Sequence, residues 1–303
     1  MSRDRSALRN RVEYAAYLGA RATAGMLGPR ALARLGGLLG EVFWRVGRRR
    51  REILDFNLAL AFPELDEAAR RARSRAVARH FGRVALDALR VQRLSPEALR
   101  AEVEVEGEEH LERAAAGGRG LFVLSAHLGS WEVAGLVAGL LLPHGLAAVN
   151  RPLDNPLLDV ELQRLRLGLG NRVLGKRSIA RDVLRELAAG GAVGILIDQR
   201  VSEEVGVPAP FFGHPTPTHP ILARLVRRSA APVVPVFAVW LAPGRYRVLF
   251  EPALELESVP DDERDDLALT ARYTAVVESV IRRWPEQWLW YHDRWRALRR
   301  ADG

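Results

Sequence analysis

Apolar and polar positions follow two different periodic patterns along this chain. Residues 7–47 and 66–93 have the pattern of helices, whereas short β-rich runs alternate with helical patterns from about residue 102 onward. In chain order, the β-rich runs cover residues 102–106, 121–125, 147–150, 172–174, 193–197, 233–240 and 246–250. The pattern predicts an α/β fold: a mixed central sheet flanked by helices, preceded by an N-terminal helical segment.

The N-terminal segment is predicted to form two helices joined near Gly28 and Pro29. The first has a loose apolar face made by Leu8, Val12, Ala15, Ala16, Leu18 and Gly19. Arginines precede this face and follow the second helix, at positions 3, 5, 9, 11 and 48–51. This arrangement is typical of a helix lying in a membrane interface, the alternative being a basic helix packed on its own domain. We expect a membrane-interface segment over residues 1–52 and the main domain over residues 53–303.

Hydropathy predicts a peripheral or monotopic protein. A membrane-spanning helix needs roughly 20 predominantly apolar residues. The apolar run over residues 14–29 is shorter and carries Arg21 in its middle. No cleavable signal peptide is evident at the N-terminus.

The composition excludes some kinds of site and favours some classes of partner. The chain has 303 residues, 48% hydrophobic and 27% charged, which is typical of a globular protein. It has no cysteine, and this excludes disulfides, thiolate metal sites and a cysteine nucleophile. The net charge of +8 favours acidic partners: anionic lipid, an acidic carrier protein or nucleic acid.

The segment around His127 carries the candidate chemistry. Residues 120–125 predict a buried strand, residues 127–130 a turn, and a helix begins at Trp131 with Ser130 as its N-cap. In α/β sheets, sites form at this carboxyl end of a strand. Across such a turn, the carboxylate of Glu132 can orient the His127 imidazole, whose other nitrogen then takes a proton from an alcohol. The alternative is a structural His–Glu pair.

The surroundings of the pair fit a reacting centre. Backbone N–H groups at the helix start can hold a developing oxyanion, and Gly129 allows backbone or substrate to approach closely. Asp198 directly follows the predicted strand over residues 193–197, so it should lie in the same crevice as His127.

The segment from Ala126 to Glu132 resembles the H-x4-E block of the late acyltransferases of lipid A biosynthesis, the lauroyl and myristoyl transferase family. Further blocks follow in the family's order and span roughly residues 50–296. They comprise Asn57-Leu58 with Phe62-Pro63-Glu64-Leu65, residues 150–156, Arg166-x3-Gly170, Ile197-Asp198-Gln199, residues 210–213 and residues 285–295. The chain departs from the usual family residues at Ser130, Arg200 and Asp293.

The resemblance implies roles for individual residues. His127 would be the general base and Glu132 its orienting partner, with direct attack on a thioester and no acyl-enzyme. Arg166, with Arg164 as the fallback, would stabilise the oxyanion or bind a phosphate. Further contacts to substrate or oxyanion are expected from Gly129, Ser130, Asp198 and Gln199. Phe211 and Phe212 are expected to line an acyl or acceptor path. Trp288, Trp290 and Trp295 are predicted to form a core cluster.

The resemblance also implies an activity. The expected reaction moves a fatty acyl chain from an acyl carrier protein thioester, or acyl-CoA, to a hydroxyl of a lipid A precursor. The expected partners are the acyl carrier protein, the glycolipid acceptor and the anionic cytoplasmic face of the cell inner membrane. No cofactor and no metal are expected, because His214 and His219 lack the spacing and acidic company of a metal site and fall in a predicted Pro-rich loop.

Two alternatives stay open at this stage. The same chemistry could serve another glycolipid, such as a phosphatidylinositol mannoside, with acyl-CoA as the donor. A non-enzymatic basic protein that binds membrane or nucleic acid is the other class. Nucleic acid is not an expected partner, because the chain carries no nucleic-acid-binding motif.

Overall fold

A computed structural model describes residues 6–149, 153–168, 170–174 and 179–301, without the side chains of residues 165, 166 and 168. The helices are α1 Ala7–Met26, α2 Pro29–Val46, α3 Arg48–Ala61, α4 Glu67–Val91, α5 Pro96–Ala101, α6 Glu108–Ala116, α7 Trp131–Leu141, α8 Pro156–Gly168, α9 Ile179–Ala188, α10 Ile221–Ser229, α11 Asp266–Arg283 and α12 Arg296–Ala301. Short 3-10 turns cover Leu256–Ser258 (η1), Asp261–Glu263 (η2) and Pro285–Gln287 (η3).

A seven-stranded mixed sheet forms the centre of the fold, in the order β1-β9-β8-β2-β5-β3-β4. Its strands are β1 Val103–Glu106, β2 Leu121–Ser125, β3 Leu146–Val149, β4 Arg172–Leu174, β5 Ala192–Leu196, β8 Val233–Ala242 and β9 Arg245–Phe250. Every neighbouring pair is parallel except β8 and β9, which form an antiparallel hairpin. The predicted mixed α/β fold is confirmed.

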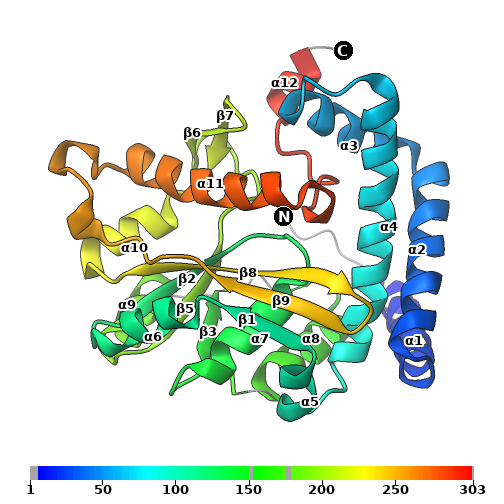
Figure 1. Cartoon of the computed structure of the whole chain (residues 1–303), viewed down its shortest axis with the longest axis horizontal. Helices are drawn as coiled ribbons and strands as arrows, with labels where there is room; N and C mark the ends of the chain where they lie inside the picture. The colour runs from blue at the N-terminus through cyan, green and yellow to red at the C-terminus, as the bar shows by residue number, and fades with distance from the viewer. Residues whose placement is uncertain (1–5, 150–152, 169, 175–178, 302–303) are drawn as a thin grey trace.

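Helices cover both faces of this sheet (Figure 1). Successive side chains of a strand point to opposite faces. In β2, accordingly, Leu121 and Val123 pack into the core beneath α6 and α7, while Phe122 and Leu124 pack into the core shared with α9, α10 and α11. Because β2 is buried on both faces, its sequence is a continuous apolar run.

Glycines allow α2 and α4 to pack in close backbone contact. A Cβ added to Gly40 would lie 2.1 Å from the carbonyl oxygen of Ala78, and one added to Gly82 would lie 2.0 Å from that of Gly36. Any larger side chain at these positions would force the two helices apart. The side chains that flank this contact on each helix are therefore held in fixed relative positions.

The sequence and the structure differ in two elements. The two predicted N-terminal helices are present, but α3, which contains the expected domain boundary after residue 52, was not predicted. The predicted Pro-rich loop around His214 is wrong: Val207–Phe211 (β6) and His214–Thr218 (β7) pair as an antiparallel hairpin. Its prolines lie at ladder positions of a two-stranded ribbon, where an edge tolerates the missing N–H.

The C-terminal segment returns to the centre of the molecule. Trp288, Trp290 and Trp295 are buried and in mutual ring contact, which confirms the predicted core cluster. The buried side chain of Asn57 on α3 donates hydrogen bonds of 2.8 Å to the carbonyl oxygens of Trp290 and His292. In the part of the chain that is described, no helix combines the length and the apolar character needed to cross a bilayer.

Candidate active site

Strand register brings His127 and Asp198 together. β2 and β5 are adjacent and parallel, with Ser125 opposite Leu196. Two residues further along each strand, His127 and Asp198 leave the sheet side by side at its carboxyl edge. The sequence analysis expected Asp198 in the same crevice as His127, and in the structure the two side chains are in direct contact.

The carboxylate of Asp198 makes two hydrogen-bond contacts with His127. Its Oδ1 lies 2.9 Å from His127 Nδ1, and its Oδ2 accepts the backbone N–H of His127 at 2.9 Å. Trp288 Nε1 donates a third hydrogen bond to Oδ2, at 2.8 Å. The Asp198 side chain is only 1% exposed, whereas that of His127 is 23% exposed. The imidazole is thus fixed from its buried side and faces the crevice with the other.

The structure adds a second carboxylate to the expected His127–Glu132 pair. The hydrogen bond at His127 Nδ1 is made by Asp198, and the orienting role expected of Glu132 stays a prediction. Glu132 lies in the first turn of α7 and acts on His127 through its negative charge. The reason is positional, because a residue across a parallel strand pair faces His127 directly, whereas Glu132 is displaced by a turn and the start of a helix.

The charges of the pair support each other. Burial by itself lowers the pKa of His127, but the charge and hydrogen bond of Asp198 and the charge of Glu132 outweigh burial and raise it above 6.5. Burial likewise raises the pKa of the Asp198 carboxyl, yet His127 and the N–H donors around it hold that pKa at about 2. Asp198 is therefore an anion throughout the physiological range, and it stabilises the imidazolium form of His127.

The tautomer of His127 follows from this contact. With its proton on Nδ1 and directed at Asp198, neutral His127 carries its lone pair on Nε2. The amide nitrogen of Gln199 lies 3.2 Å from Nε2. Gln199 is an exposed side chain, so it can move aside when a substrate hydroxyl takes this position. The arrangement provides a general base.

Two neighbouring segments clamp the turn that carries His127. Gly129 N–H donates to the carbonyl of Gln287 at 2.8 Å, and Ser130 N–H donates to the carbonyl of Ala238 on β8, also at 2.8 Å. The backbone carbonyl of His127 in turn accepts a hydrogen bond from the N–H of Leu289 at 3.0 Å. Ser130 occupies the predicted N-cap position of α7, but its side chain makes no capping hydrogen bond.

The same hydrogen bonds limit which backbone N–H groups can bind an oxyanion. The N–H groups of Gly129 and Ser130 are already used in the clamp. The N–H groups of the first turn of α7, beginning at Trp131, have no partner within an α-helix. We therefore expect the helix start to supply the oxyanion donors, assisted by the helix dipole.

Gly129 is required by two independent features. Its φ is +55°, and an added Cβ would lie 2.1 Å from the carbonyl oxygen of Ala238. The sequence analysis expected such a close approach, and β8 makes it. We expect Gly129→Ala to lower the free energy of unfolding by about 2 kcal/mol or more, since the left-handed conformation alone costs an alanine 1–2 kcal/mol. Thermal unfolding would measure the loss, and a wild-type midpoint would contradict this account.

Other predicted site residues lie elsewhere or outside the described structure. The predictions for Arg166 concern a side chain that is not among those described. Arg164, 69% exposed, forms an ion pair of 2.8 Å with Glu161, which also binds Arg21 of α1. Glu161 therefore joins α8 to α1, and Arg164 pairs with it within α8. Its expected contact with a substrate stays a prediction.

The phenylalanine pair lies in the core. Phe211 stacks on Trp295, and Phe212 meets Trp290 with ring centroids 5.7 Å apart. Both phenylalanines are buried. Their expected lining of an acyl path stays a prediction, whereas their packing beneath the site is observed.

Sequence reasoning missed one contributor to the site. Trp288 was predicted to lie in the core, yet its indole N–H also donates a hydrogen bond to the carboxylate of Asp198. The available signal was its amphipathic side chain, because a buried tryptophan N–H usually finds an acceptor. Among the described residues, no group of three or more His, Cys, Asp or Glu side chains has the arrangement of a metal site.

Comparison with known proteins places the chain in a family. The model for "Bacterial lipid A biosynthesis acyltransferase" matches residues 2–297. The lipid A biosynthesis palmitoleoyltransferase of Escherichia coli (strain K12) is 30% identical over 271 residues, covering 88% of this chain and 85% of that protein. The lauroyltransferase of the same strain is 30% identical over 270 residues, covering 87% and 85%. Its myristoyltransferase is 28% identical over 290 residues, covering 91% and 85%.

Among solved structures, the 1-acyl-sn-glycerophosphate acyltransferase PlsC of Thermotoga maritima aligns with a TM-score of 0.41 and 14% identity, covering 88% of this chain and 99% of that one. The family match is far stronger, because it extends over almost the whole chain and includes the segment from His127 to Glu132. The resemblance seen in the sequence is confirmed: this chain belongs to the bacterial lipid A biosynthesis acyltransferase family and is an acyltransferase.

Proposed function

We propose that this protein transfers a fatty acyl chain from an acyl carrier protein thioester to a hydroxyl of a lipid A precursor. The observation that carries the proposal is the His127–Asp198 pair at the edge of β2 and β5, in a chain of the lipid A acyltransferase family. The relatives' names supply the acceptor class.

The proposed reaction proceeds by direct transfer. His127 Nε2 takes the proton of the acceptor hydroxyl as its oxygen attacks the thioester carbonyl carbon. The carbonyl oxygen becomes an oxyanion, which the N–H groups at the start of α7 stabilise. The intermediate then collapses, the carbon–sulfur bond breaks, and the imidazolium returns its proton to the departing thiolate. Asp198 stays ionised and positions His127 throughout.

The charge of the chain supports an acidic donor protein and an anionic surface. A net charge of +8 attracts both, and electrostatic attraction speeds encounter. No acyl-enzyme is proposed, since the base acts directly on the acceptor and the chain has no cysteine.

The outer face of α2 supports a peripheral location on the cytoplasmic face of the inner membrane. Five large apolar side chains, each at least 45% exposed, follow one another at helical spacing: Leu38, Leu39, Val42, Phe43 and Val46. We call these five the α2 apolar stripe. Arginines 45 and 48–50 adjoin it and are exposed. An apolar stripe beside exposed cations matches the interface of an anionic bilayer.

Charge placed in the α2 apolar stripe should weaken membrane binding. We expect Leu39→Glu with Val46→Glu to lower partition onto anionic vesicles by 10-fold or more, because two apolar contacts of roughly 1.5–3 kcal/mol each are lost. Both positions are exposed, so the fold should survive. Leu298→Glu, an exposed apolar residue on α12, is the control. Vesicle sedimentation provides the measurement, and equal binding by both variants would contradict the membrane proposal.

The activity itself is tested with two donors and a defined acceptor. Purified protein is incubated with a lipid A precursor and either acyl carrier protein or CoA carrying the same labelled acyl chain. We expect transfer from the carrier protein at the higher kcat/KM. Mass spectrometry of lipids from a deletion strain gives the second readout. A lipid A lacking one secondary acyl chain supports the proposal, whereas loss of an acyl chain from another glycolipid contradicts it.

A further inference from the structure

A small pocket of about 200 Å³ lies between the loop after β5, the β6–β7 hairpin and the C-terminal segment. The hairpin and α12 stand on the same side of the sheet (Figure 1). The charged side chains that line the pocket are Arg200, Glu203, Arg294, Arg296 and Arg300. None of them has a role in the acyl transfer described above. We call this site the Arg294 pocket.

Positive charge predominates in the lining of the Arg294 pocket. Four arginines line it, against the single carboxylate of Glu203. Asp293 lies next to Arg294 in the chain, but its two carboxylate oxygens accept hydrogen bonds of 2.9 and 2.7 Å from Arg299. The charge of Asp293 also acts on Arg200 and Arg296. An additional anion would therefore enter a favourable electrostatic environment here.

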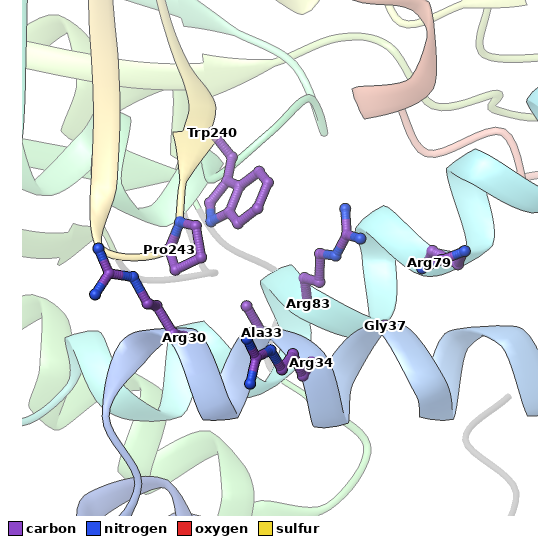
Figure 2. A pocket seen from close by; sticks show the side chains of 8 residues that line it. All are labelled: Arg30, Ala33, Arg34, Gly37, Arg79, Arg83, Trp240 and Pro243. Carbon is purple, nitrogen blue, oxygen red and sulfur yellow. The ribbon is translucent and has the colours of Figure 1, made fainter.

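The larger arginine-lined pocket between α2, α4 and the β8–β9 hairpin is different (Figure 2). There, the charge of Arg79 acts on Glu41, and Glu286 lines the adjoining pocket, which shares Arg79 and Arg83 with it. Carboxylates of the chain thus already offset the charge of that region.

Buried donors in the Arg294 pocket point to a missing acceptor. Arg294 is fully buried, and its Nη2 donates a hydrogen bond of 2.7 Å to Thr218 Oγ1. Among the described residues, Arg294 Nε and Nη1 find no hydrogen-bond partner, and neither does the buried Nε1 of Trp295. Both side chains can only donate. The group that completes this site must therefore be an acceptor.

The charge of Arg294 favours an anion as that acceptor. Burial lowers the pKa of Arg294 to about 10, with the charge of Asp198 acting against burial and that of Arg200 adding to it. The hydrogen bonds of Asp198 go to His127 and Trp288, so Asp198 acts on Arg294 only through its charge. A buried cation without a hydrogen-bonded counter-ion is costly. An anion that accepts from Nε and Nη1 would remove this cost.

The size of the pocket indicates one group of a larger molecule. Pockets that enclose a whole small-molecule ligand measure roughly 300–1,000 Å³, whereas this one measures about 200 Å³. A phosphate group presents several oxygens around one centre, and guanidinium groups bind such oxygens in pairs. Several arginines around a small pocket therefore match a phosphate group.

The position of the pocket indicates which substrate carries the phosphate. β2 lies between β8 and β5 in the sheet. The start of α7, where the thioester carbonyl is expected, is bonded to β8 through Ser130. Gln199, whose amide lies where the acceptor hydroxyl is expected, follows β5 on the other side of β2. Arg200 is the next residue and forms a bridge with Thr218 of the hairpin. The pocket therefore adjoins the acceptor side of His127.

We propose that the Arg294 pocket binds a phosphate group of the acceptor and thereby places the acceptor hydroxyl at His127 Nε2. Arg294 and Trp295 supply the buried donors, and Arg200 and Arg296 add charge at half-buried positions. The inference rests on the proposed function, because it names a feature of the acceptor that the same site recognises.

The first experiment measures how strongly the full-length protein prefers a phosphorylated acceptor. Acyl transfer is assayed on a lipid A precursor before and after a phosphatase has removed its phosphate groups, and the two values of kcat/KM give a ratio. Arg200→Gln with Arg296→Gln should lower this ratio about 10-fold or more, because charge-assisted hydrogen bonds are lost. Arg294→Lys, which keeps the charge but loses the planar fork, should lower it too.

A matched double variant serves as the control. Arg113→Gln with Arg228→Gln removes two exposed charges from α6 and α10, outside the pocket, and should leave the ratio within about 2-fold. Equal losses in this control would mean general attraction and would overturn the proposal. An unchanged ratio in the pocket variants would also overturn it. If the KM for acyl carrier protein rose instead, the phosphate would belong to the donor and not to the acceptor.

The second experiment does not depend on activity. Inorganic phosphate is titrated at constant ionic strength while thermal unfolding is followed. The wild-type midpoint should rise by about 3 °C or more when phosphate reaches ten times its dissociation constant, and the pocket variants should not respond. Failure of the proposed function would appear as absent acyl transfer with this shift intact. Failure of the present inference would appear as acyl transfer with neither the shift nor a change in the ratio.

Discussion

Replacing His127 by alanine is expected to lower kcat/KM for acyl transfer by about 10²-fold to 10⁴-fold, the usual contribution of a general base. His127 Nε2 faces the crevice while Asp198 holds Nδ1, so this nitrogen is positioned to take the acceptor proton. The measurement is initial rate against acceptor concentration, with labelled acyl carrier protein. We expect kcat to fall far more than KM changes, because the proton moves only during the reaction.

The control for this experiment is His144→Ala. His144 is exposed beyond the end of α7, and its backbone carbonyl accepts a hydrogen bond from Arg172. Thermal unfolding should accompany both assays, because His127→Ala removes the charge and the hydrogen bond of the imidazole from buried Asp198. His127→Gln retains a polar side chain and repeats the test. A folded His127 variant with wild-type kcat would eliminate the proposed mechanism.

Replacing Asp198 by asparagine is the second large prediction. The carboxylate raises the pKa of His127 by charge and by its hydrogen bond, so its removal lowers that pKa. In the wild type, kcat/KM should fall as the pH drops through a pKa above 6.5, because protonated His127 cannot act as a base. In Asp198→Asn the acid limb should move to lower pH. The plateau should also drop by about 10²-fold or more, since the imidazolium then loses the carboxylate that accepts its Nδ1–H.

Glu132→Gln distinguishes the two carboxylates. Glu132 raises the pKa of His127 less than Asp198 does, through its charge alone. We therefore expect its acid limb to shift in the same direction but by a smaller amount. A larger shift in Glu132→Gln than in Asp198→Asn would restore Glu132 as the orienting partner. The pH profile matters here because a purely structural defect would lower the plateau without moving the limb.

The fold was largely readable from periodicity. Buried strands such as β2 and β5 appear as short apolar runs. The helix α3 was not predicted because its first turn is a run of arginines, although Ile53, Leu54 and Leu58 further along share a buried face. The β6–β7 hairpin escaped because its prolines resemble a loop.

In the candidate site, too, local features were predicted from the sequence and a long-range contact was not. His127, Glu132 and Gly129 were identified from one continuous segment, since the strand–turn–helix pattern and the family block are both local. The contact between Asp198 and His127 joins residues 71 apart in the chain. The sequence analysis anticipated a common crevice but not which carboxylate would reach Nδ1, because that choice depends on the register between β2 and β5.

The sequence by itself determined the class of the protein: an α/β acyltransferase of the lipid A biosynthesis family, with His127 at the carboxyl end of a buried strand. Only the tertiary structure decided that Asp198 contacts this histidine and that Trp288 supports Asp198. The physical reason is that local patterns specify elements and their faces. Contacts between distant elements depend on strand register and on how closely helices pack, which glycines such as Gly40 and Gly82 set here.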